Sequence, residues 1–152
     1  MPHGSSSTPP DGPLEPIRAR KDALQQAAVA LESSLAEPST TAQWRDGVRA
    51  ALDRAREALE QHIFDSAGPA GLPASVMASS PRLSGPARRL ASEHGDLLEH
   101  HRALAVLVAD GHVAPDRLRD AAAEMAALMM QHVHHAQDLL VDAVEEELGA
   151  GD

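Results

Sequence analysis

Apolar residues recur at steps of three and four positions along four stretches of this chain, the spacing that places them on one face of an α-helix. We expect helices over residues 14–36, 40–66, 86–111 and 115–149. Prolines, glycines and serines separate these stretches and mark turns. Four amphipathic helices joined by mostly short connections predict an all-α protein, an up-down-up-down four-helix bundle.

Local signals indicate where these helices begin. Thr40, followed three residues later by Gln43, has the pattern of a capping box, so we expect Thr40 to cap the second helix. Pro86 and Pro115 suit the first turns of the third and fourth helices, because a helix leaves its first N–H groups unpaired in any case.

Two parts of the chain lie outside the long helices. The connection over residues 68–85 is the longest, and we expect a helical turn within it around residues 73–78. Residues 1–13 are rich in serine, proline and glycine and predict a disordered tail. The remaining length suits a single domain, which we expect over residues 14–149.

Composition and charge narrow the classes of function. The chain has no cysteine, which excludes disulfides, thiolate metal sites and cysteine nucleophiles. Its formal net charge of -10 argues against nucleic acid and anionic membrane surfaces as partners. No run of apolar residues is long enough to span a membrane. Because the start of the chain lacks the pattern of a signal peptide, we expect a cytoplasmic location.

Histidines interrupt the apolar stripes of the second, third and fourth helices, at His62, His94 and His132. In an antiparallel hairpin, residues equally far from the turn lie at one height. His94 lies about 18 residues before its turn and His132 about 20 after it, a mismatch of roughly 3 Å. The same counting puts Lys21 and His62 within roughly 8 Å in height. We therefore expect one residue from each helix in a single slab of the bundle.

Converging histidines in a bundle core indicate a metal site, because an unpaired buried imidazole costs roughly 1–3 kcal/mol. Three neutral imidazoles with an open position suit ferrous iron, zinc or copper, and a haem between facing histidines is a further option. Asp65, His101 and His135 are candidate additional ligands because they lie three, seven and three residues after the stripe histidines.

The alternative is a set of core histidines that hydrogen-bond one another, backbone carbonyls or water without any metal. For His101, a structural role and metal binding are equally favoured. His135 is intermediate between such a core residue and a histidine on a solvated helix face. Lys21 either extends its ammonium group to solvent or takes the place of a ligand.

Several short features of the chain resemble the hemerythrin-like family. They are His62 near the end of its helix, the Gly-Pro-x-Gly-Leu turn at residues 68–72, Pro-Arg-Leu at residues 81–83, the Glu93-His94 pair, and His132 ahead of Asp-Leu-Leu at residues 138–140. In order and spacing they span nearly the whole chain after the tail. The resemblance implies a hemerythrin-like four-helix bundle that holds paired non-haem irons with five histidines and two bridging carboxylates.

The chain departs from this family at four ligand positions. The family pattern places histidines, a glutamate and an aspartate where this chain has Lys21, Ser66, Leu98 and Gln137. Three of the seven usual ligands are present, and on this resemblance they are His62, His94 and His132. The expected cofactor is therefore non-haem iron, mononuclear or dinuclear, with zinc, haem or no metal as the alternatives.

Two main functions follow from these patterns. The first is a hemerythrin-like metal-binding protein with a redox or dioxygen-related role, in which dioxygen or another small molecule takes the open position. The second is a metal-free bundle of the same kind that binds a small molecule or a protein partner, or uses its histidines for acid-base catalysis. The sequence names neither a substrate nor an oligomeric state.

Overall fold

The structure is a computed structural model that describes the backbone of residues 15–151 and the side chains of residues 23–151. Its elements are α1 (Glu15–Ala36), α2 (Ala42–Ala67), α3 (Leu72–Ser79), the 3-10 helix η1 (Pro81–Leu83), α4 (Ser84–Ala109) and α5 (Pro115–Gly149). The described residues contain no strand, so the expectation of an all-α protein is confirmed. The tail expected over residues 1–13 and the side chain of Lys21 lie outside the described residues.

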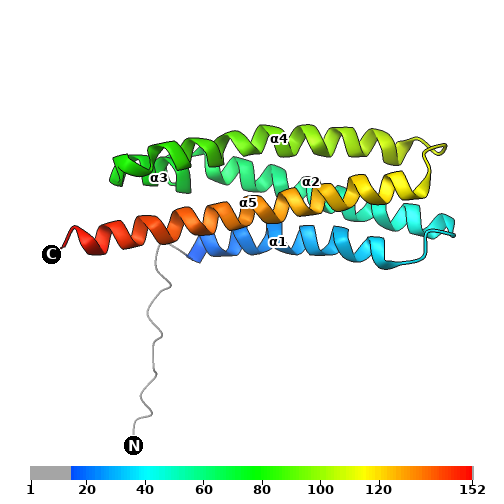
Figure 1. Ribbon diagram of the computed structural model, residues 1–152, viewed down its shortest axis with the longest axis horizontal. Coiled ribbons are helices and arrows are strands. Elements are labelled where there is room, and N and C mark those ends of the chain that lie inside the picture. The colour runs from blue at the N-terminus through cyan, green and yellow to red at the C-terminus, as the bar shows by residue number, and fades with distance from the viewer. Residues whose placement is uncertain (1–14, 152) are drawn as a thin grey trace, which may run out of the picture.

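Four long helices lie side by side along the long axis of the molecule (Figure 1). The colour gradient shows the chain turning back after α1, α2 and α4, and the short α3 lies beside the beginning of α4. With 35 residues, α5 is the longest helix, and it extends past the beginning of α1. Among the described residues, no helix combines the length and the hydropathy needed to cross a bilayer.

The apolar stripes of the four long helices meet in the interior. The main core cluster draws on all of them and includes Leu24, Leu31, Leu59, Leu118 and Met129, each less than 2% exposed. A smaller cluster at the α3 end joins Val76, Ala87, Leu90, Leu139 and Ala143. The two clusters are separate, and the buried His132 lies at the level between them.

The ends of the helices differ in detail from the expected ones. Thr41, not Thr40, caps α2, and its hydroxyl oxygen accepts a hydrogen bond from the backbone N–H of Trp44 at 3.3 Å. The long connection is more ordered than expected, because α3 occupies eight residues of it and η1 leads directly into α4. For the same reason α4 begins at Ser84 rather than at Pro86.

A close approach of the backbone fixes the chain reversal after α2. A Cβ atom at Gly71 would lie 2.1 Å from the carbonyl oxygen of Ser66, so only glycine fits there. At the other end of the bundle, the Arg45 guanidinium donates hydrogen bonds to the carbonyls of Asp110 and Val113, at 2.8 and 2.7 Å. These contacts fix α2 against the α4–α5 connection and so set the heights of the helices relative to one another.

Candidate metal centre

Three histidines from three helices lie together at the level between the two core clusters. They are His62 on α2, His94 on α4 and His132 on α5, and one ring nitrogen from each lies within 4.8 Å of the other two. The three ring centroids are 4.9 to 5.2 Å apart, and each pair packs edge to face. These are the three histidines that the apolar stripes place at one height.

Neighbours along each helix explain why these side chains point inward. On α4, His94 lies between Leu90 of the smaller cluster and Leu97 of the main cluster. On α5, His132 is followed by the buried Val133 and, seven residues on, by Leu139. His132 is 1% exposed, whereas His62 and His94 are half-buried. The helical period that buries the leucines therefore also directs the imidazoles into the bundle.

Hydrogen bonds assign the proton positions of two of these rings. Nδ1 of His132 lies 2.7 Å from Oε2 of Glu93, and because a carboxylate accepts, this Nδ1–H donates. Nε2 of neutral His132 is then an acceptor, and it lies 2.9 Å from Nε2 of His62, which donates to it. Nε2 of His94 is buried and has no hydrogen-bond partner among the described residues.

Burial favours the neutral form of two of these imidazoles, His94 and His132. The pKa of His94 is lowered from 6.5 to about 4: desolvation is the largest cause, the nearby His132 acts in the same direction, and Glu93 opposes the shift. Desolvation also lowers the pKa of His132, although its hydrogen bond to Glu93 acts in the opposite direction. Neutral imidazoles keep the lone pairs that a metal ion needs.

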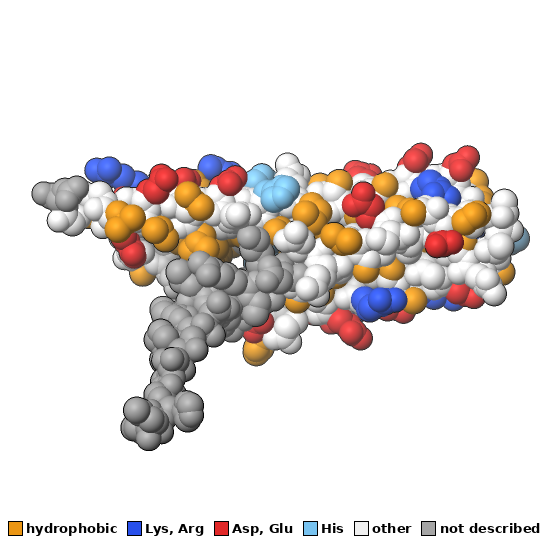
Figure 2. All heavy atoms as spheres, turned by 90° about the horizontal axis from the view of Figure 1, so that it is seen from below, with side chains coloured by type: hydrophobic (Ala, Val, Ile, Leu, Met, Phe, Trp, Pro, Cys, Tyr) orange, Lys and Arg blue, Asp and Glu red, His pale blue; other side chains and the backbone are white. Residues whose placement is uncertain are grey.

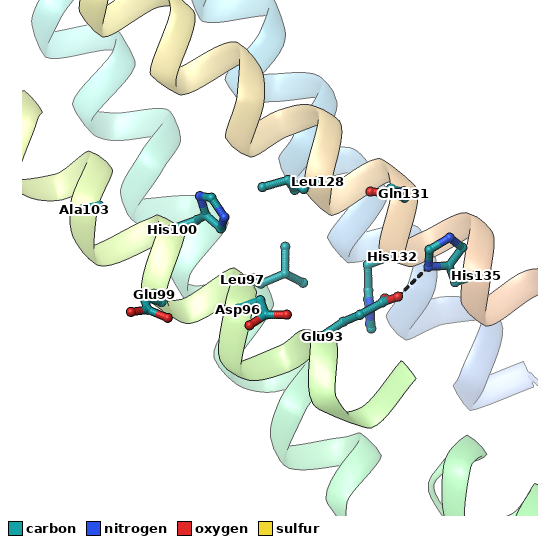
Figure 3. A pocket seen from close by; sticks show the side chains of 10 residues that line it. All are labelled: Glu93, Asp96, Leu97, Glu99, His100, Ala103, Leu128, Gln131, His132 and His135. Carbon is teal, nitrogen blue, oxygen red and sulfur yellow. Dashed lines mark hydrogen bonds and ion pairs between the residues drawn. The ribbon is translucent and has the colours of Figure 1, made fainter. Parts of the chain in front are cut away.

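A groove of about 460 Å³ runs along the outside of the cluster between α4 and α5, and His132 forms part of its wall (Figure 3). Its lining includes the carboxylates of Glu93, Asp96 and Glu99, and among the described residues it contains no lysine or arginine. Glu93 extends across the groove, and its Oε1 accepts a hydrogen bond from Nδ1 of His135 at 2.5 Å. On the face of the molecule in Figure 2, acidic and basic side chains are interspersed with small apolar patches.

The other candidate ligands do not belong to this group of three. His101 is buried one layer away, where its Nε2–H donates to the carbonyl oxygen of Leu52 at 3.0 Å, so its observed role is structural. Asp65 accepts a hydrogen bond from the side-chain amide of Gln61 at 3.0 Å. His135 hydrogen-bonds Glu93 and is not one of the three grouped histidines.

Glu93 is the participant that sequence reasoning missed. It forms half of the Glu93-His94 pair in the family resemblance, but the sequence pattern indicates no contact for it. The available signal was a carboxylate beside a stripe histidine on α4, at the height of His132 on α5. Helical spacing alone does not reveal this contact, because the bond depends on how α4 and α5 rotate against each other.

Within the described part of the chain, the three histidines are the only group of three or more histidine or carboxylate side chains spaced to hold a metal ion. Two of the four departures from the family pattern, Ser66 and Leu98, are half-buried, and Gln137 is exposed. Comparison of this chain with known protein families, curated proteins and solved structures finds no match. The resemblance to the hemerythrin-like family therefore rests on the residues quoted above.

Proposed function

We propose that this protein binds one transition-metal ion through His62, His94 and His132. The observation that carries the proposal is the buried Nε2 of His94, which has no hydrogen-bond partner among the described residues although two other imidazoles surround it. A buried donor or acceptor left in this state costs roughly 1–3 kcal/mol. A metal ion bound by all three imidazoles would remove that cost.

The donor set fits a metal that accepts neutral nitrogen ligands. At metal–nitrogen bonds of about 2.0–2.1 Å, ligand nitrogens of one ion lie roughly 3.0–3.4 Å apart. The 2.9 Å between Nε2 of His62 and Nε2 of His132 is within a few tenths of an ångström of that range. The ligand nitrogens of all three histidines lie within 4.8 Å of one another, so the third ring would move inward around a bound ion. Three imidazoles suit ferrous iron, zinc or copper, and they leave coordination positions open for dioxygen or another small molecule.

Two of the expected cofactors fit this arrangement poorly. A haem between facing histidines needs room for its ring, and the direct contact between His62 and His132 leaves none. A pair of irons needs more donors than the three imidazoles of the group provide. We therefore favour a single ion, with non-haem iron as the first candidate.

The hemerythrin-like form of the bundle, with its up-down-up-down order and its dioxygen or redox role, belongs to the same proposal. It is supported by the family features quoted above and by one histidine on each of three long helices. When bound, the ion would supply a Lewis acid or a redox centre. The chain itself supplies the neutral ligands and a site bordered by two apolar clusters.

The test is elemental analysis of the purified protein before and after reconstitution with ferrous iron, zinc or copper. We expect one ion per chain in the wild type and a loss of at least tenfold in affinity in His94→Ala. His134→Ala is the matched control, because His134 is an exposed histidine of α5 outside the group. A wild type that stays free of metal after reconstitution would refute the proposal.

One observation favours the metal-free alternative. The hydrogen bonds from His62 to His132 and from His132 to Glu93 satisfy His132 without any ion. Such a bundle would serve as a binding module for a small molecule or a protein. Acid-base catalysis by the same histidines is less favoured, because a base with a pKa of about 4, such as His94, is poorly matched to neutral pH.

A further inference from the structure

We propose that Glu93 is a positioning residue that presets His132 for metal binding, and that the solvent-exposed His135 holds Glu93 in place. The affinity of the buried histidines for metal would then depend on a contact at the protein surface. The part of this inference that concerns metal affinity rests on the proposed function. The part that concerns the proton position on His132 does not, because it applies to the metal-free protein.

The geometry is that of a two-point clamp between helices. Glu93 on α4 accepts two hydrogen bonds: its Oε2 accepts from Nδ1 of His132 at 2.7 Å, and its Oε1 accepts from Nδ1 of His135 at 2.5 Å. The two histidines are three residues apart on α5, so they share a helix face and meet both oxygens of one carboxylate. Side-chain exposure rises along this chain of contacts, from 1% at His132 through 27% at Glu93 to 44% at His135.

The consequence for His132 follows from imidazole chemistry. A neutral imidazole carries its single proton on either nitrogen, and only the other nitrogen has the lone pair that binds a metal. A carboxylate oxygen next to Nδ1 favours the form with the proton on Nδ1, because the alternative would place a lone pair against a negative charge. The lone pair is then on Nε2, the nitrogen that faces His62. Glu93 thus selects the form of His132 that is ready to bind.

The role of His135 follows from the freedom of the carboxylate. Glu93 is partly exposed in the groove between α4 and α5, and with one partner its carboxylate would be free to rotate. The hydrogen bond from His135 fixes the second oxygen and hence the orientation of the first (Figure 3). His135 therefore acts on the buried site through Glu93 and is not itself one of the group of three.

The first test is a two-bond ¹H–¹⁵N NMR spectrum of the histidine side chains in the metal-free protein at pH 8. We expect His132 to carry its proton on Nδ1 in the wild type and in Glu99→Gln, which removes one negative charge from the same helix and groove. In Glu93→Ala we expect a mixture of the two forms. In Glu93→Gln the amide oxygen still accepts from His132, so the Nδ1–H form should be largely restored.

An unchanged His132 spectrum in Glu93→Ala would overturn the positioning role. A purely structural role for Glu93 would alter stability but would leave the proton position as it is. If Glu93→Ala fails to fold, the wild type and Glu93→Gln decide instead, and His132→Ala identifies which signals in their spectra belong to His132. A wild-type His132 that carries its proton on Nε2 would contradict the proposal.

The second test is metal affinity, measured by competition with a chromophoric chelator. Loss of a carboxylate that orients a histidine ligand typically weakens metal binding by about 10- to 100-fold. We expect a loss of this size in Glu93→Ala, a smaller loss in His135→Ala, and wild-type affinity in Glu99→Ala. A wild type that binds no metal refutes the proposed function and leaves the NMR test standing. A wild type and a Glu93→Ala variant that bind equally well refute this inference alone.

Discussion

Acid should destabilise the metal-free protein through His94 before the carboxylates begin to titrate. The pKa of His94 is lowered to about 4 in the folded protein, whereas the unfolded chain has the ordinary value of 6.5. Folding therefore favours the neutral imidazole. The stabilisation is fully present above pH 6.5, and it is lost as the pH falls towards 4, because the unfolded chain takes up a proton that the folded protein refuses.

The size of this effect follows from the two pKa values. Between pH 7 and pH 5, this difference in pKa corresponds to roughly 2 kcal/mol of unfolding free energy for a fully shielded group. His94 is only half-buried, and solvent screening reduces the effect to roughly 1 kcal/mol. The pKa of His132 is lowered as well, so it should add to the loss in the same direction.

Urea unfolding of the protein at a series of pH values from 7 to 5, in the presence of a chelator, measures this effect. We compare the wild type with His94→Leu, so that the contributions of all other groups cancel to first order. The free energy of unfolding should fall by roughly 1 kcal/mol more in the wild type than in the variant. Equal pH dependence in the two proteins would show that His94 does not stay neutral in the folded state, and the reasoning would be wrong.

Three further predictions concern stability. Gly71→Ala should lower the free energy of unfolding, because its Cβ would lie 2.1 Å from the Ser66 carbonyl oxygen. Gly47 lies inside α2 with open space around it, so Gly47→Ala should raise the free energy of unfolding by about 0.5–1 kcal/mol. Urea unfolding of the two variants checks the sign of each change. Arg45→Ala should cost about 1–3 kcal/mol through the loss of two hydrogen bonds to the α4–α5 connection, and a thermal midpoint equal to that of the wild type would contradict this. A metal at 100 times its Kd should stabilise the wild type by about 2.7 kcal/mol and His94→Ala far less. Calorimetry with and without a chelator measures the metal-induced shift of the thermal midpoint in each protein. Equal shifts in the wild type and in His94→Ala would refute the prediction.

Helical periodicity was sufficient to predict the long helices and most of the interior. Leu59, Leu97, Leu104 and Met129 all lie in the core as their stripes indicate, because the 3.6-residue period depends only on local geometry. The ends of the helices were harder to predict. The choice of Thr41 over Thr40 as a cap rests on backbone angles that two adjacent threonines do not reveal.

The level of the histidines was also predictable, because counting residues from a turn gives the height of a side chain in a bundle. Which nitrogens face each other was not, since the rotation of each helix about its axis comes from packing of the whole core. His101 illustrates the difference: it lies on the same stripe as His94, yet its Nε2–H donates to the Leu52 carbonyl instead of joining the group. The contact of Glu93 with His132 has the same origin.

The X-ray absorption spectrum of the protein reconstituted with one equivalent of zinc tests the central claim most directly. We expect scattering from three imidazole rings at about 2.0–2.1 Å, with at least one further oxygen ligand in the open position. The spectrum of His94→Ala should lose one imidazole, and that of His134→Ala should match the wild type. A wild-type spectrum with only oxygen ligands, or one that His94→Ala leaves unchanged, would contradict a metal centre built from His62, His94 and His132.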